Sequence, residues 1–134
     1  MITQLSISTR RRVEFVHITP DVQRAVRDSG VKSGTCVVYV PHTTAAVTIN
    51  ENADPDVQRD ITAQLERVVP HQGGYHHTEG NADAHIKASM IGSSETLLVE
   101  DGAIVLGTWQ GVFFCEFDGP RSRQVYIKVI ADAE

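Results

Sequence analysis

The chain has 134 residues, of which 41% are hydrophobic and 22% charged, proportions ordinary for one globular domain. Its net charge of −5 argues against nucleic acids and membranes as partners, because phosphate backbones and anionic lipids need a basic surface. No apolar run is long enough for a membrane span or a secretion signal. Cys36 and Cys115 lie in apolar runs without a CxxC pair, so we expect buried free thiols in a cytoplasmic protein.

The N-terminal part predicts strands followed by a helix. Residues 2–16 alternate between apolar and polar side chains well enough for one or two strands. The basic run 10–12 is interpreted as a solvated edge. Thr19 is expected to cap a helix that Gly30 ends.

Two buried strands and the best helix of the chain are predicted next. The strands are residues 35–40 and 46–49, which are apolar and rich in β-branched side chains. Asp54 should cap the helix that follows, and Pro70 should end it. Its apolar face consists of Val57, Ile61, Leu65 and Val68. Residues 71–81 read as a polar loop, and Asn81 is expected to cap a short helix through Ile91.

The second half of the chain is predicted to be rich in strands. Residues 96–100 and 103–106 flank Asp101-Gly102, a dipeptide that favours a tight hairpin. Residues 111–117 and 124–130 are two further apolar strands. The expected fold is therefore a single α+β domain over residues 1–134, a largely antiparallel sheet or sandwich with two or three short helices.

Histidines stand out among the polar clusters at the ends of these elements. His42 directly follows a predicted strand, while His77 and His85 bracket a glycine turn. Three imidazoles can hold zinc and leave one position open for water or substrate. The alternative is a mobile surface loop that happens to contain histidines, because the spacing matches no compact metal motif.

The only tryptophan, Trp109, lies between two glycines and is interpreted as a core residue in a bulge. Its neighbours Thr108 and Gln110 should point to the opposite face, where they could bond a ligand.

A charged cluster follows over residues 116–123. Arg121 and Arg123 should share a face of an extended segment, and paired guanidinium groups suit phosphate. The alternative, given equal weight, is a set of surface ion pairs with Glu116 and Asp118.

These clusters, in this order, resemble the YjbQ-like family, also called the secondary thiamine-phosphate synthase family. The match covers nearly the whole chain, and its most specific segments are 107–111 and 85–89. The matching residues are His42-Thr43-Thr44-Ala45, Asn50-Glu51, Asp54-Pro55, Asp60, Tyr75, His77, Gly80-Asn81-Ala82, residues 84–89, residues 106–111, Glu116, Asp118-Gly119-Pro120-Arg121 and Arg123.

The resemblance implies a small α+β fold, a homotrimer and a metal pocket at the three histidines. It also implies a weak or secondary ability to join a hydroxymethylpyrimidine diphosphate to a thiazole phosphate. Diphosphate release usually needs magnesium, whereas three histidines suit zinc. Either Glu51, Asp54 or Asp83 holds a magnesium–diphosphate, or the activity is incidental.

We therefore expect a small metal-dependent enzyme acting on a phosphorylated small molecule. The expected metal ligands are His42, His77 and His85. The expected substrate-binding residues are Arg121, Arg123, Lys87, Thr108, Gln110 and Asn81. Either Glu51 or Glu116 would act as acid or base. The alternatives are a non-catalytic trimer that binds a metal or a metabolite, and a metal-dependent hydrolase.

Overall fold

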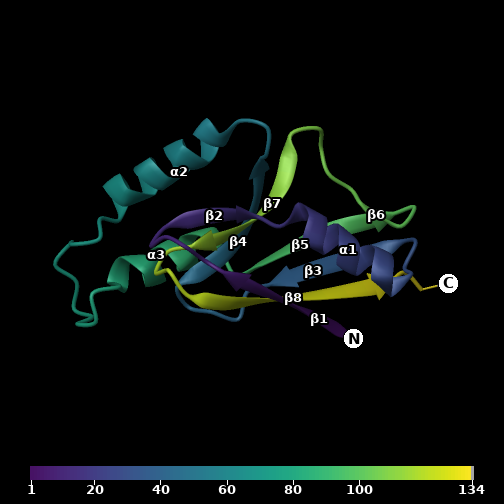
Figure 1. The fold of residues 1–134 in the computed structure, drawn as a ribbon, viewed down its shortest axis with the longest axis horizontal. Helices are drawn as coiled ribbons and strands as arrows, with labels where there is room; N and C mark the ends of the chain where they lie inside the picture. The colour runs from purple at the N-terminus through teal and green to yellow at the C-terminus, as the bar shows by residue number, and fades with distance from the viewer. Residues whose placement is uncertain (134) are drawn as a thin grey trace.

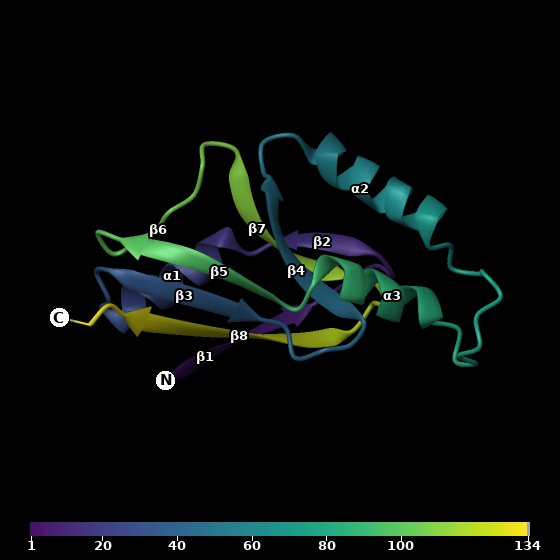
Figure 2. The same cartoon turned by 180° about the vertical axis from the view of Figure 1, so that it is seen from behind.

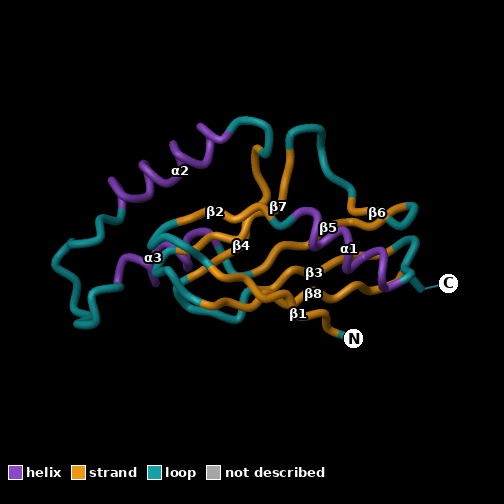
Figure 3. The backbone as a smooth tube through the Cα atoms, in the orientation of Figure 1, coloured by secondary structure: helices purple, strands orange, loops and turns teal. Residues whose placement is uncertain are grey.

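The computed structural model describes residues 1–133, which form eight strands and three helices (Figures 1 and 3). Every strand pair in this part of the chain is antiparallel, and the strands form two sheets. The larger sheet contains, in spatial order, β1 (Ile2–Ser8), β8 (Ser122–Ala131), β3 (Gly34–Tyr39), β5 (Ser94–Glu100) and β6 (Ala103–Ile104). The smaller sheet contains β2 (Glu14–His17), β7 (Gln110–Glu116) and β4 (Ala45–Glu51). The predicted antiparallel α+β fold is confirmed.

The main core lies where the two sheets and the first helix meet. Helix α1 (Thr19–Ser29) buries Val22, Ala25 and Val26 against the strands, and Gly30 ends it at a φ of 72°. Strands of both sheets add apolar side chains to this cluster, among them Val38 of β3 and Phe114 of β7. Both thiols are buried as predicted, and burial raises the pKa of Cys36 to about 11.

A second apolar cluster holds helix α3 (Ala82–Ile91) against the smaller sheet. Ala84 and Ala88 of the helix pack on Ala46 and Phe117. The small alanine side chains let the helix approach the strands closely. Because β4 directly follows the His42 loop, this contact brings α3 beside that loop (Figure 2).

Helix α2 (Pro55–Val68) begins as predicted, because Asp54 accepts a hydrogen bond from the backbone N–H of Asp56. Unlike the other two helices it has no buried residue, and it stands off from the sheets in both views (Figures 1 and 2). The described residues include no helix with the length and apolar character that crossing a membrane requires.

Four local predictions need correction. Thr19 does not cap α1, because its hydroxyl accepts a hydrogen bond from the N–H of Val112 instead. Asn81 makes no side-chain cap for α3. Trp109 is 63% exposed rather than part of the core. Arg12 is no solvated edge residue, because it pairs with the buried carboxylate of Asp83 at 2.9 Å.

Candidate functional site

The predicted histidines gather at one end of the molecule. His42 lies in the loop between β3 and β4, His77 in the loop between α2 and α3, and His85 on the first turn of α3. The turn between β7 and β8, residues 117–121, carries the hydrogen-bonding partners of this region (Figure 1).

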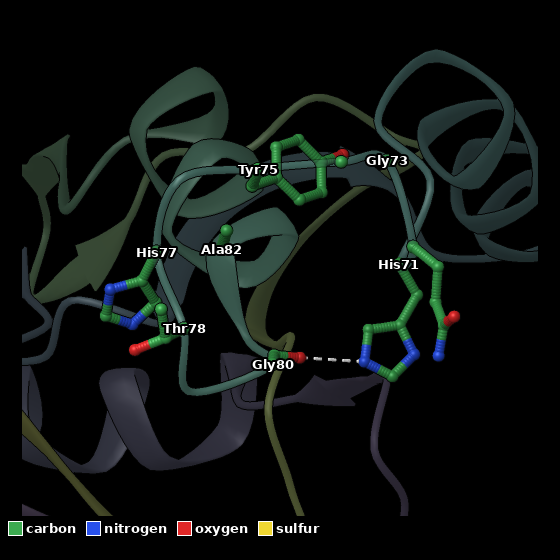
Figure 4. Close-up of a pocket in the computed structure, with 9 residues that line it drawn as sticks. His71, Gly73, Tyr75, His77, Thr78, Gly80 and Ala82 are labelled. Carbon is green, nitrogen blue, oxygen red and sulfur yellow. Dashed lines mark hydrogen bonds between the residues drawn. The ribbon is translucent and has the colours of Figure 1, made fainter.

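His77 and His85 form a close pair. Their ring centroids are 5.3 Å apart, and the rings meet edge to face at 78°. His77 is exposed at the rim of a hollow of about 280 Å³ formed by its own loop (Figure 4). His71 lies at the opposite end of this hollow, where its Nε2 contacts the carbonyl oxygen of Gly80 at 2.8 Å. That contact closes the loop that carries His77.

Asn81 connects the pair to the β7–β8 turn. Its Oδ1 lies 2.9 Å from Nε2 of His77, and its Nδ2 donates to Oδ2 of Asp118 at 2.8 Å. Both polar ends of this amide are therefore engaged inside the protein. The predicted role of Asn81 in binding substrate gains no support from these contacts.

His42 faces a separate hollow of about 510 Å³, which His85 also lines. Its Nε2 accepts a hydrogen bond from the backbone N–H of Gln124 at 2.9 Å. Burial and the nearby cation of Arg123 lower the pKa of His42, so the ring is neutral and its proton sits on Nδ1. His42 therefore offers the hollow an N–H donor and has no free lone pair for a metal.

The three histidines consequently do not form one three-ligand site within a single chain. Within residues 1–133 no group of three or more His, Cys, Asp or Glu side chains is placed to hold an ion. This finding also covers the carboxylates expected to hold magnesium. Among these, Glu51 and Asp54 accept backbone hydrogen bonds and Asp83 is buried in an ion pair.

Arg123 is a buried structural residue. Its Nε donates to Oε1 of Glu116 at 2.8 Å, and its Nη2 contacts Oε2 of Glu116 and donates to Oγ1 of Thr44 at 2.8 Å. Arg123 is 4% exposed and Glu116 is fully buried. The guanidinium group is therefore occupied, and Arg123 does not share an open face with Arg121.

Glu116 is not suited to the predicted acid–base role. Burial alone would raise its pKa, but hydrogen bonds from Arg123, from the N–H of Asp118 and from Thr9 outweigh burial and hold the pKa below its usual range. The carboxylate stays charged and fully paired. The pairing with Glu116 was one of the two interpretations of the sequence, although the pair is buried rather than at the surface.

Lys87 belongs to a second buried network. Its Nζ lies 2.9 Å from Oδ2 of Asp83 and 3.1 Å from Oε1 of Glu66, and the lysine is 2% exposed. Burial would raise the pKa of Asp83, yet the hydrogen bonds from Arg12 and Lys87 lower it overall. Lys87 thus fastens α2 to α3, while Arg12 fastens the N-terminal segment to the same Asp83, and the lysine does not reach out to phosphate.

Three predicted residues lie elsewhere. Gln110 pairs with Glu51 at one end of the smaller sheet, whereas Glu116 pairs with Ala45 at the other. Six residues of strand at about 3.3 Å each separate these ends by roughly 20 Å. Glu51, Gln110 and the adjacent Thr108 therefore do not line the histidine hollows. Arg121 remains at the surface in an ion pair of 2.8 Å with Asp118.

Sequence reasoning missed the roles of Thr9, Arg12 and His71. Thr9 donates to Glu116 at 2.8 Å across 107 residues of sequence, and Arg12 reaches Asp83 across 71. Such pairs leave no local pattern in the sequence. His71 stands in the polar loop that was noted, but no spacing rule connects it to Gly80.

Comparison with known proteins places the chain among relatives that match it from end to end. The family model described as UPF0047 protein YjbQ-like matches residues 3–132. The chain belongs to this family. A UPF0047 protein of Methanocaldococcus jannaschii is 52% identical over 98% of this chain and 96% of its own length, and YugU of Bacillus subtilis is 47% identical over 97% and 99%.

Solved structures of relatives share the fold. A YjbQ/UPF0047 protein from Clostridium acetobutylicum has 54% identity and a TM-score of 0.94, covering 96% of this chain and 99% of its own. A protein from Sulfolobus solfataricus has 32% identity and a TM-score of 0.95, covering 98% and 97%.

These relatives overturn the functional prediction. The C. acetobutylicum protein is described as uncharacterized and the S. solfataricus protein as of unknown function, and the description of the matching family model names no activity. Membership therefore gives no support to thiamine phosphate synthesis or to a metal-dependent enzyme acting on phosphorylated molecules. Arg123 is paired with Glu116 and Lys87 with Asp83, and all four side chains are buried. These pairs remove the main structural argument for a phosphate substrate. The prediction was wrong because it took an activity from the family resemblance, and the relatives that show the family are described without one.

Proposed function

We propose that the protein binds a divalent transition metal between His77 and His85, with zinc as the preferred ion. The spacing of the two rings is the observation that carries this proposal. A zinc ion about 2.1 Å from one nitrogen of each ring, at a tetrahedral angle, would place the ring centroids about 5.4 Å apart. The centroids lie 5.3 Å apart, so their spacing suits one ion, and rotation of the rings out of their edge-to-face contact would turn one nitrogen of each toward it.

The chain supplies two ligands to such an ion. Zinc sites usually have four ligands, so the remaining positions would be open to water, to a small molecule or to a second copy of the chain. Histidine nitrogens with no sulfur ligand suit zinc, copper or nickel better than magnesium. His42 lines the same hollow as His85, and this supports a role in which its N–H would donate to a group bound there.

Calorimetric titration with zinc chloride, with elemental analysis of the purified protein, tests the metal site. The His77→Ala and His85→Ala variants should lose at least ten-fold in zinc affinity, while His42→Ala should retain most of it. His76→Ala is the matched control, because His76 is an exposed histidine of the same loop. Equal losses in the control, or none in the two ligand variants, would remove the site.

We also propose that copies of this chain associate through α2, as the homotrimer implied by the family resemblance requires. An apolar hollow of about 390 Å³ lies between α2 and α3. At its edge Val68 is 58% and Met90 54% exposed, which is costly to leave in water and suits an interface. Light scattering should give a trimer for the wild type and a smaller species for Val68→Asp. A monomeric wild type would contradict the assembly.

A further inference from the structure

We infer that Asp118 and Asn81 are positioning residues that fix the tautomer of His77. The inference deepens the metal site proposed above and rests on it for its function. The contacts that carry it form a chain from the β7–β8 turn to the histidine loop and connect residues 37 positions apart in sequence.

The first step fixes the orientation of the Asn81 amide. Oδ2 of Asp118 lies 2.8 Å from Nδ2 of Asn81, and the Nη2 of Arg121 donates to the same oxygen at 2.8 Å. A carboxylate oxygen in an ion pair can only accept hydrogen bonds, so the NH2 end of the amide must face Asp118. A reversed amide would set two acceptors against each other.

Asp118 is itself held in place. Its backbone N–H donates to Oε2 of the buried Glu116 at 3.0 Å, and Arg121 also binds its carbonyl oxygen through Nε at 2.7 Å. The carboxylate is only 15% exposed, so water competes little for it. The orientation of Asn81 is therefore set by a turn anchored in the core.

The second step transfers that orientation to the histidine. With its NH2 end on Asp118, Asn81 presents Oδ1 to Nε2 of His77 at 2.9 Å. Because this oxygen only accepts, Nε2 must carry the proton, and the neutral ring then keeps its lone pair on Nδ1. A metal-binding histidine usually donates its other N–H to an oxygen in this way. A reversed amide would move the proton to Nδ1 and block the metal.

The test measures tautomer and metal affinity separately. Long-range ¹H–¹⁵N spectra of the metal-free protein, taken well above the usual histidine pKa of about 6.5, report which ring nitrogen of His77 is protonated. Wild type should show only the Nε2–H form. Asp118→Leu and Asn81→Leu should each give a mixture of tautomers and a ten- to hundred-fold loss of zinc affinity, the size expected for partners of metal ligands. Asp118→Asn keeps an acceptor oxygen and should restore most of both.

The outcomes separate the two proposals. If both leucine variants leave His77 in the Nε2–H form with zinc affinity within two-fold of wild type, the positioning role is refuted. An Asp118→Asn variant as impaired as Asp118→Leu also refutes it, since an amide oxygen should suffice. If wild type binds no zinc but the leucine variants still shift the tautomer, the metal site fails while the positioning of His77 stands.

Discussion

Replacing Arg123 with methionine removes the cation from a pair in which neither side chain is more than 5% exposed. The carboxylate of Glu116 then stays buried without its counter-charge, and Thr44 loses a donor. Breaking one side of a buried pair costs about 3–5 kcal/mol. A domain of this size has a total stability of about 5–15 kcal/mol, so the variant should lose a large part of it.

Urea unfolding at neutral pH measures the loss directly, and a fall in Tm of about 10–20 °C should accompany it. The matched control is Arg59→Met. Arg59 pairs with Asp56 at the same 2.8 Å that separates Arg123 Nε from Glu116, but the two side chains of the control pair are 76% and 66% exposed. An exposed pair contributes less than about 1 kcal/mol.

A double variant, Arg123→Met with Glu116→Gln, identifies the cause of the loss. Removing the buried charge should recover part of the stability lost in the single variant, because glutamine is neutral and its one carbonyl oxygen can still accept from the N–H of Asp118. If Arg123→Met costs no more than Arg59→Met, or if the double variant recovers nothing, Glu116 does not depend on the guanidinium group. The reasoning that assigns Arg123 to the fold would then be refuted.

Three further perturbations follow from individual contacts. Folding lowers the pKa values of Asp83 and Glu116. Their contribution to the free energy of unfolding is therefore complete above the unfolded pKa values of about 4 and is lost as the pH falls below them, which urea unfolding at a series of acidic pH values should show. Trp109→Ala should leave the urea midpoint nearly unchanged, because the side chain is 63% exposed. Gly34→Ala should destabilise strongly in the same assay, since a Cβ would lie 2.0 Å from the carbonyl oxygen of Ile130.

Local signals in the sequence were enough to predict most of the elements. Asp54 and Pro55 start α2 as capping chemistry requires. Asp101 and Gly102 adopt φ angles of 52° and 74° between β5 and β6, the positive pair that a tight hairpin needs. In both cases the deciding interaction is made by neighbours in sequence, so a short stretch of residues carries the information.

The candidate site could be predicted only in part, because its contacts are long-range. His77 and His85 come from one stretch of chain, and their proximity was foreseen. Arg123 meets Thr44 across 79 residues, and no periodicity reveals that a charged residue near a turn points inward. For Trp109 the opposite prediction failed, because we expected a core residue in a bulge between two glycines and the side chain is exposed to solvent.

The two buried ionic networks contain motif residues, among them Lys87 and Arg123, that the sequence analysis expected to bind substrate. A buried ion pair adds little net stability compared with apolar packing, so stability alone does not account for two of them in a small domain. Both networks adjoin the histidines. Glu116 binds the backbone N–H of Asp118, which leads to Asn81 and His77, and Lys87 ties α3 to α2 two residues after His85. Directional bonds of this kind hold a side chain within the narrow tolerance that a metal ligand needs. If His77 and His85 hold a metal as proposed, these motif residues would act on it through the histidines beside them, and Asp118 is the residue at which this distinction can be measured.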